Sequence, residues 1–524
     1  MKRGRRDRSR DGFRNRLEVF FFSNFRGFWW LIQRNQWLKL KANEILINIV
    51  VNKLPNRPHA LSTLSPYTSW SSLTDQRWTG RHLPPAPDFN HSDRLPSLEA
   101  LQVLFQKRDG KTIYSDKSTL LFPYWVQWFT DGFLRVDPNN RQQNTSNHQI
   151  DLSPVYGLTP KATDVLRSKI GGKLKSQMIN GEEYPEYLYA DPQNNIFKEE
   201  FEGLYEPLNR VNQLPAELKA KFFAMGVERS NVQIGYVMLN VLCLREHNRL
   251  CNLLSAHHPD WDDERLFQTA RNILIVIILK IVVEEYVNHI TPYHFNVVAD
   301  PQPFWKAQWN RPNWMTVEFS LVYRWHSALP DRIQYNGQDY PVVETMWNND
   351  LITRRGLGIL FDEASSQPAT QIGLFNTSEL LQEVELATVQ WGRETQMASY
   401  NDYREMSQYP RVTDFDQITG DPETQALLKD LYGHVDNVEF YVGLNAEDPR
   451  PDSAIPLLIE RLIASDAFSA VLTNPLFSEH VFKPETFSKE GWQEILKTRS
   501  LAQIVQRNIP DAHQNYRVSF YQDG

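Results

Sequence analysis

The segment EFSLVYRWH, residues 318–326, is the most informative stretch of the 524-residue sequence. Its apolar residues recur with helical spacing, and the run Leu329-Pro330-Asp331 that follows is typical of a helix end. Tyr323 and His326 are three residues apart, so a helix over 313–326 would place both on one face. On spacing alone, such a pair is more often structural than catalytic.

The two side chains nevertheless suit one kind of chemistry. A neutral imidazole such as His326 is a common axial ligand of haem iron. A phenol such as Tyr323, held close to an oxidised haem, can give up an electron and a proton and form a tyrosyl radical. Such a radical takes a hydrogen atom from a weak C–H bond between two double bonds.

A second segment, QWFTDGF at residues 127–133, is expected on another aromatic helix. Gln127 and Asp131 are four residues apart and share a helix face, with Thr130 beside them. They would present polar groups to an apolar pocket above an iron. Taken alone, an Asp near a helix end is as well explained as a solvated residue.

A third segment, LREHNRL at residues 244–250, carries alternating charges, which is typical of a salt-bridged helix. His247 lies outside any His-Glu-x-x-His zinc pattern, so we expect it to be structural. The sequence contains no Walker loop, Gly-x-Gly-x-x-Gly, Gly-x-Ser-x-Gly or Cys-x-x-Cys motif.

Bulk composition points to an ordinary globular protein, with 41% hydrophobic residues, 12% aromatic residues and a net charge of -7. Nothing in this balance suggests nucleic acid as a partner. Residues 1–16 form a basic tail, which is either a solubilising segment or an attachment to anionic lipid. The only cysteines, Cys243 and Cys251, are eight residues apart, or about 12 Å along a helix, which is too far for a disulfide.

The distribution of apolar residues predicts a mainly α fold. Residues 17–58 alternate aromatic clusters with Lys and Arg, so we expect short amphipathic helices lying on a membrane rather than packed on the main body. Residues 59–524 would form one catalytic domain, which begins with an extended Pro- and Ser-rich segment up to about 115. Helical periodicity covers 116–135, 216–256, 262–288, 313–326, 378–406 and 454–473, and 334–343 predicts one hairpin at Asn336-Gly337.

No signal peptide or membrane-spanning run is expected, because the apolar stretch 273–279 is interrupted by Lys280. That stretch is typical of a buried core helix. With two unpaired cysteines, these features favour a cytoplasmic protein attached peripherally to a membrane.

Several further runs, in order along the chain, resemble the prostaglandin-forming cyclooxygenases of the animal-type haem peroxidase superfamily. They are DLSPVYGL, KLKSQMINGEEYP, LREHNRLCNLLSAHHPDWDDERLFQTARNILI, IVVEEYVNHITPYHF, EFSLVYRWHSALPD, QMASYNDYRE, FDQITGD, LYGHVDNVEFYVGL and DPRPDSAI. The resemblance covers roughly residues 25–520 and extends to fatty-acid dioxygenases of bacteria, fungi and plants. It implies a haem-peroxidase-type helical domain behind membrane-binding helices, a possible homodimer and, in this chain, a bacterial enzyme.

The resemblance also implies residue roles. His326 matches the ligand of the haem b iron, Tyr323 the radical tyrosine and Gln127 the distal glutamine, while Trp325 and Thr130 lie beside the haem. Tyr286 matches the residue that hydrogen-bonds the radical tyrosine, and Tyr293 matches one at the mouth of the substrate channel. The matching channel-lining positions are Val287, Ile290, Phe319 and Val322.

Two departures from the family pattern bear on function. Asp131 stands where the family has a distal histidine, the acid and base of peroxide cleavage, so peroxidase turnover is expected to be weak. Val50 falls where the family has the arginine that pairs with the substrate carboxylate, and Lys53 or Arg57 is a possible substitute.

The expected activity is therefore dioxygenation of an unsaturated fatty acid by molecular oxygen, giving a hydroperoxide. Formation of a prostaglandin-type endoperoxide is the second expectation. A haem peroxidase acting on small donors and a non-catalytic lipid or haem carrier remain as alternatives.

Overall fold

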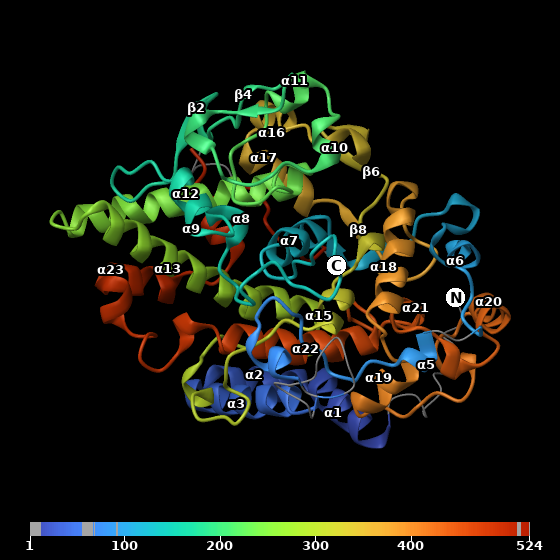
Figure 1. Cartoon of the computed structure of the whole chain (residues 1–524). Helices are drawn as coiled ribbons and strands as arrows, with labels where there is room; N and C mark the ends of the chain where they lie inside the picture. The colour runs from blue at the N-terminus through green and yellow to red at the C-terminus, as the bar shows by residue number, and fades with distance from the viewer. Residues whose placement is uncertain (1–11, 55–66, 68, 91–92, 511–514, 523–524) are drawn as a thin grey trace.

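A computed structural model describes residues 12–54, 67, 69–90, 93–510 and 515–522. Outside these residues lie Arg57, residues 1–11 of the predicted basic tail and residues 55–58 at the end of the amphipathic zone. The fold is mainly helical, as the sequence predicts, and its long helices cross one another around a central core (Figure 1).

The helices are numbered in the order in which they occur along the chain. Their bounds are α1 Phe13–Asn24, α2 Arg26–Arg34, α3 Gln36–Val51, α4 Trp70–Thr74, α5 Pro87–Asn90, α6 Leu98–Phe105, α7 Leu121–Thr130, α8 Ser153–Tyr156, α9 Pro160–Leu166, α10 Asn209–Asn212, α11 Ala216–Lys219 and α12 Ile234–His257. They continue with α13 Asp263–Ile281, α14 Asn288–Ile290, α15 Val317–Val322, α16 Asp350–Arg355, α17 Leu357–Ser365, α18 Gln382–Glu394, α19 Tyr400–Met406, α20 Pro422–Tyr432, α21 Phe440–Ala446, α22 Leu457–Leu472, α23 Pro484–Lys497 and α24 Leu501–Arg507.

Two long helices, α12 and α13, pack against each other and form the centre of the core. The α13 helix begins where the Asp262 side chain accepts a hydrogen bond from the Arg265 backbone N–H, at 2.8 Å. Residues 273–279 are at most 5% exposed, which confirms the predicted core helix. The helical stretch Asp263–Ile290 is apolar and long enough to span a membrane, but 83% of its most apolar window is buried inside the protein.

Helix α7 lies unusually close to α12. A Cβ atom built on Gly235, at the start of α12, would come within 2.0 Å of the Tyr124 ring on α7. Only glycine permits this approach, which brings the polar end of α7 next to the first turn of α12.

The strands are short and form two-stranded pairs in the part of the chain that the structure describes. The predicted hairpin is confirmed as β6 Arg332–Tyr335 and β7 Gln338–Pro341, with Asn336 and Gly337 both at positive φ in its turn. Three pairs were not predicted. They are β1 Tyr114–Thr119 with β8 Pro368–Thr370, β2 Ser176–Ile179 with β3 Glu182–Pro185, and β4 Tyr189–Asp191 with β5 Ile196–Phe197.

Several predicted helices were wrong in extent. The helix expected over 216–256 is interrupted, because 220–233 is irregular, and the helix expected from 116 begins only at Leu121, after β1. The extended segment expected over 55–115 contains the regular helix α6, whose N-terminus is capped by Ser97. The many Pro and Ser residues around α6 obscured the helical spacing of its apolar residues.

The helix expected over 313–326 is also shorter than predicted. It extends only over Val317–Val322, and Tyr323 and Trp325 have non-helical dihedral angles. The indole N–H of Trp325 donates to the Val322 carbonyl at 2.6 Å, which satisfies a carbonyl that a continuing helix would use. Tyr323 and His326 therefore do not share a helix face: Tyr323 lies in the turn after α15, and His326 begins the short 3-10 helix η5, His326–Ala328.

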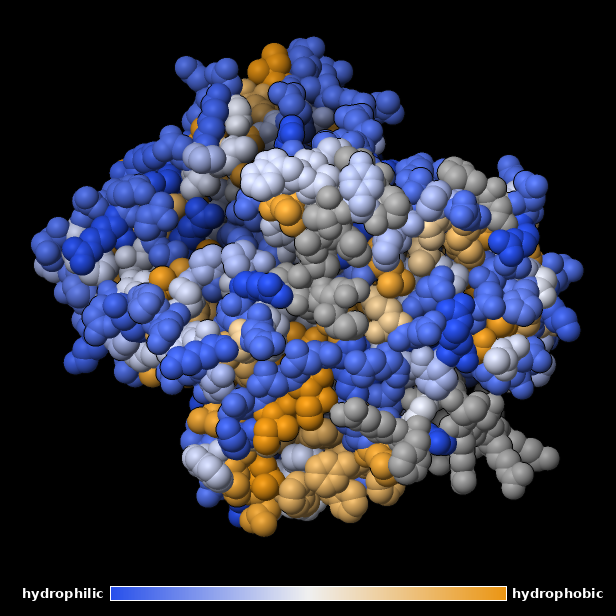
Figure 2. Space-filling view, turned by 60° about the horizontal axis from the view of Figure 1, so that its bottom comes forward, coloured by the Kyte–Doolittle hydropathy of each residue, from blue (hydrophilic) through white to orange (hydrophobic). Residues whose placement is uncertain are grey.

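The N-terminal helices α1, α2 and α3 form a separate layer along one edge of the molecule, at the bottom of Figure 1. Helix α3 packs on α22 through buried side chains that include Leu46, Ile47 and Val51. Much of the outer face of the layer is apolar, and it forms the orange patch low in Figure 2. The large hydrophobic side chains exposed there are Leu17, Phe20, Phe21, Phe25, Phe28, Trp30, Leu31, Trp37, Ile45 and Ile49.

Candidate functional site

A cavity of about 1460 Å³ lies between α7, the start of α12 and the loop that follows α15. We call it the His326 cavity. Its lining brings together the residues for which the sequence predicts roles in catalysis or haem binding. They are Gln127, Thr130, Asp131, Tyr323, Trp325 and His326.

A buried carboxylate holds the ring of His326. The imidazole Nδ1 lies 3.1 Å from Oε2 of Glu385 on α18. Glu385 also accepts hydrogen bonds from the hydroxyl groups of Thr377, at 2.8 Å, and Tyr441, at 2.5 Å. Because a carboxylate only accepts, it selects the tautomer with the proton on Nδ1. No described residue bonds Nε2, so this nitrogen is available to an iron ion.

Glu385 is a residue that the sequence reading missed. It is 59 positions from His326 in sequence, so no local motif joins the two. One signal was present, because Glu385, Thr388 and Val389 lie at helical spacing and are all buried. An acidic residue on the inward stripe of a helix needs a buried partner, and here the partner is the imidazole.

Tyr323 is buried and contacts three aromatic side chains. The hydroxyl of Tyr286 donates to the Tyr323 hydroxyl at 3.2 Å, the contact that the sequence predicts between these residues. The Tyr323 ring lies 5.1 Å from the rings of both Phe319 and Trp325, between ring centroids. Burial raises the pKa of Tyr323 above its ordinary value, so the phenol keeps its proton at neutral pH.

Tyr286 owes its position to a π-helical turn, η3, at Val282–Val287. Such a turn widens the helix by one residue and redirects the side chains that follow it. The Tyr286 ring is fully buried and stacks on Phe122, which stacks in turn on Trp325. Tyr323 and its hydrogen-bond partner Tyr286 are thus held between fixed aromatic rings.

Asp131 faces the same cavity but is surrounded by cations. Its oxygens lie 3.5 Å from nitrogen atoms of both Arg135 and Arg229, and Tyr236 donates to Oδ2 at 2.9 Å. Gln127 beside it accepts from the Gln233 side-chain amide at 2.8 Å. A carboxylate held by two cations is a poorer acid–base group for peroxide cleavage than a free imidazole. Gln233 and Tyr236 were not predicted.

Three arginines on the wall of the His326 cavity suit anionic groups. Arg210, Arg229 and Arg324 all contribute to its lining. The Nε atom of Arg324 is buried without a hydrogen-bond partner among the described residues, and burial lowers the pKa of its guanidinium to about 10. A haem carries two propionate carboxylates, so these cations and the free Nε2 of His326 fit haem.

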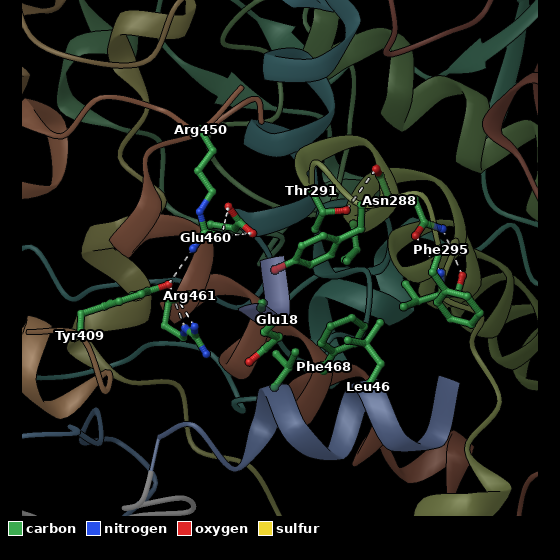
Figure 3. A pocket seen from close by; sticks show the side chains of 15 residues that line it. Glu18, Leu46, Asn288, Thr291, Phe295, Tyr409, Arg450, Glu460, Arg461 and Phe468 are labelled. Atoms are coloured by element: carbon green, nitrogen blue, oxygen red, sulfur yellow. Dashed lines mark hydrogen bonds and ion pairs between the residues drawn. The ribbon is translucent and has the colours of Figure 1, made fainter. Parts of the chain in front are cut away.

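A second cavity lies where α22 meets the N-terminal helices, and we call it the mouth cavity (Figure 3). Of the predicted channel residues, Val287 and Tyr293 line it. Ile290 and Val322 are buried in the core, at 0% and 1% exposure. Val50 lines the cavity, and Lys53, expected as a partner for a substrate carboxylate, instead forms an ion pair with Glu18 at 2.8 Å.

Other histidines and cysteines have structural roles. His247 is buried between the Tyr156 hydroxyl and the Gly172 carbonyl, both at 2.9 Å, and burial lowers its pKa to about 4. Cys243 and Cys251 are free thiols, as the sequence predicts. Within the described part of the chain, no group of three or more His, Cys, Asp or Glu side chains is arranged to hold a metal ion.

Comparisons with known proteins agree with this arrangement. Residues 97–520 match the animal haem peroxidase family. Prostaglandin G/H synthase 2 of Bos taurus is 32% identical over 504 residues, which cover 94% of this chain and 80% of that protein. Prostaglandin G/H synthase 1 of Rattus norvegicus is 31% identical over 507 residues, covering 94% and 81%.

Solved structures show the same fold. Fatty acid alpha-dioxygenase of Oryza sativa superposes with a TM-score of 0.70 at 16% identity, covering 97% of this chain and 98% of that one. Peroxidase A of Dictyostelium discoideum superposes with a TM-score of 0.68 at 20% identity, covering 85% and 95%.

Proposed function

Because the chain belongs to the animal haem peroxidase family, we propose that it is a dioxygenase that converts unsaturated fatty acids to hydroperoxides. The protein is a haem-dependent oxidoreductase, and its relatives include prostaglandin synthases and, by fold, fatty acid dioxygenases. The observation that carries the proposal is the place of Tyr323. Its phenol lines the same cavity as the free imidazole nitrogen of His326 and is hydrogen-bonded by Tyr286.

In this proposal, His326 binds the haem iron through Nε2, while Glu385 fixes the ring and increases its basicity. Arg210, Arg229 and Arg324 hold the propionates, and Trp325 and Thr130 complete the walls. When bound, haem supplies the one-electron oxidation that converts Tyr323 to its radical.

The oxygenation then uses Tyr323 twice. The tyrosyl radical takes a hydrogen atom from a C–H bond between two double bonds, which re-forms the phenol and leaves a carbon radical. Molecular oxygen adds to that carbon and gives a peroxyl radical. The peroxyl radical takes the hydrogen atom back from Tyr323, so one hydroperoxide forms and the tyrosyl radical is regenerated. Tyr286 orients the phenolic oxygen throughout.

The environment of Asp131 favours a hydroperoxide as the final product. Reduction of a hydroperoxide needs an acid–base group in the His326 cavity. Asp131 is ion-paired there to Arg135 and Arg229, and Gln127 carries no ionisable group. Slow peroxide cleavage still suffices, because each radical formed serves many turnovers.

The apolar outer face of α1, α2 and α3 supports peripheral attachment to a membrane (Figure 2). A cluster of exposed Phe, Trp, Leu and Ile side chains on short helices is typical of proteins that lie in a bilayer interface. The mouth cavity opens next to this layer, so a fatty acid would reach it directly from the lipid. A cytoplasmic location and a homodimer belong to the same proposal.

Replacement of Tyr323 by Phe tests the proposal. Oxygen uptake with linoleate should be abolished in Tyr323→Phe, whereas peroxide-dependent oxidation of a small donor and the haem absorption spectrum should be retained. Oxygen uptake by Tyr323→Phe at the wild-type rate would contradict the radical role of this residue.

A haem peroxidase acting on small donors is the second candidate, favoured by the size of the His326 cavity. It predicts rapid donor oxidation and no uptake of oxygen with any fatty acid. The ion pairs of Asp131 argue against the small-donor peroxidase. An efficient peroxidase needs an acid–base group in the His326 cavity that readily takes up and releases a proton.

A further inference from the structure

The charged groups around the mouth cavity do not cancel. Glu18 is neutralised by Lys53 at 2.8 Å, and Glu460 is neutralised by Arg450 at 3.3 Å. Arg461, the next residue on α22, also lines the cavity and forms no ion pair with any described carboxylate. The cavity therefore carries one uncompensated positive charge (Figure 3).

Arg461 is only 8% exposed, so its charge has little water to stabilise it. Two of its nitrogen atoms, Nε and Nη2, donate to the Tyr409 hydroxyl at 3.2 and 3.0 Å, and Nη2 also reaches Asn15 Oδ1 at 3.3 Å. These partners are neutral, and Nη1 bonds no described residue. The Glu18 carboxylate attracts Arg461 but is already paired with Lys53. A buried guanidinium with no carboxylate of its own is costly, which favours a ligand that supplies negative charge.

Apart from these charged groups and the polar side chains of Asn288, Thr291, Tyr293 and Tyr409, the walls of the mouth cavity are apolar. Leu46 and Val50 from α3, Val287 and Phe295 from the central segment, and Ala464 and Phe468 from α22 form its walls. Charge at one end and hydrocarbon walls around it are the chemistry of a long-chain carboxylate. The wall residue Val287 directly follows Tyr286, whose hydroxyl bonds Tyr323, so one helical segment joins the mouth cavity to the reacting phenol.

We infer that Arg461 binds the carboxylate of the fatty acid substrate, in the role for which the sequence reading offered Lys53 or Arg57. This inference rests on the proposed function. The anchor lies next to Asn15 of α1 and outside the lining of the His326 cavity, so it holds the carboxyl end away from Tyr323. Mid-chain methylene groups, and not the carbon next to the carboxylate, then face the radical.

The decisive experiment places a competing carboxylate beside Arg461. Ala464 lies three residues further along α22 and shares its face, so Ala464→Glu would pair with Arg461, while Ala464→Gln adds similar bulk without charge. Binding of radiolabelled linoleic acid and its methyl ester to the haem-loaded full-length chain is measured by equilibrium dialysis without oxygen.

We expect wild type and Ala464→Gln to prefer the acid over the ester by about 10- to 100-fold, as for a hydrogen bond to a charged group. Ala464→Glu and Arg461→Met should lose this preference, whereas Arg461→Lys should keep most of it. Equal preference in Ala464→Glu and Ala464→Gln, or no preference in wild type, would overturn the inference.

This test does not depend on turnover. If the chain binds the acid through Arg461 but consumes no oxygen, the proposed dioxygenase fails and the carboxylate site stands. If the chain consumes oxygen but does not prefer the acid over the ester, the carboxylate site at Arg461 fails and the proposed dioxygenase stands. Tyr409→Phe removes the hydrogen bonds of Arg461 to that hydroxyl but not its charge, so it should keep the preference even where stability falls.

Discussion

Two carboxylates associated with the His326 cavity, Glu385 and Asp131, have opposite surroundings. Glu385 lies behind the imidazole of His326 and accepts hydrogen bonds from neutral hydroxyl groups. Asp131 lies on the cavity wall and faces two guanidinium groups at 3.5 Å. One carboxylate is arranged to direct its charge toward a metal ligand, and the other has its charge cancelled.

The chemical role of each carboxylate therefore depends more on its hydrogen-bond and ion-pair partners than on its closeness to the cavity. In the proposed role, Glu385 acts through His326 as a positioning residue that sets the tautomer and basicity of the ligand. Asp131 has its two oxygens occupied by Tyr236, Arg135 and Arg229, which makes it a poorer acid–base group than a free imidazole. Changing each partner set should therefore change a different property.

The largest effect is expected on the Asp131 side. Asp131→His would place a proton-transferring group where Asp131 is ion-paired, and general acid–base catalysis contributes about 10²- to 10⁴-fold. Peroxidase turnover with a small donor should rise by roughly 10²-fold or more, measured by stopped-flow absorbance with hydrogen peroxide.

Asp131→Asn is the matched control, since it keeps the size of the side chain and adds no acid or base. Its turnover should stay within a few-fold of wild type. If Asp131→His and Asp131→Asn have the same rate, the distal acid–base group is not what limits the peroxidase step.

On the His326 side we expect a smaller effect with a different signature. Glu385→Gln keeps an acceptor near Nδ1 but removes the charge, so His326 becomes a weaker ligand. Haem affinity should fall by about 10- to 100-fold, and the ferric/ferrous midpoint potential should rise because the ferric ion loses more stabilisation.

Spectroelectrochemical titration of the two haem-loaded proteins measures the midpoint potential directly. Thr377→Val serves as the control, because it removes one hydrogen bond to Glu385 and leaves the charge. An unchanged potential in Glu385→Gln would show that the carboxylate does not act on the metal ligand.

A third carboxyl, that of Glu285, differs from both Glu385 and Asp131. No described cation pairs with it, and no described hydroxyl group donates to it. Burial raises its pKa from 4.5 to about 7, with only the Leu501 backbone N–H to stabilise the charge. Between these two values the folded chain keeps a proton that the unfolded chain loses. Glu285 should therefore make the protein less stable as the pH rises through this window, with no further loss above it.

Glu285→Gln removes that dependence. At pH 8 the variant should gain on the order of 1 to 2 kcal/mol relative to wild type compared with their difference at pH 4.5, measured as the free energy of unfolding. Parallel pH profiles for the two proteins would contradict the raised pKa.

Local patterns and family resemblance predicted much of the fold and one half of the site. The helical period of 262–288 located α13, and Asn336-Gly337 located the hairpin. Tyr323, His326, Gln127 and Asp131 were found because each lies in a short motif that resembles the family, and the structure brings all four to one cavity.

The remainder of the site depends on contacts that no local motif records. Glu385 is 59 residues from His326, and Arg461 is 446 residues from Asn15. The break after Val322 was also missed, because the indole of Trp325 ends the helix through a hydrogen bond that helical periodicity does not show. For the same reason, the sequence did not show that Lys53 forms an ion pair with Glu18.

The most direct measurement of the central claim is an oxygen-electrode trace of the haem-loaded protein given oleate, linoleate and arachidonate in turn. We expect rapid uptake with the polyunsaturated acids, after priming with a trace of peroxide, and one fatty-acid hydroperoxide for each oxygen consumed. No uptake with any of the three acids would contradict a radical dioxygenase at Tyr323.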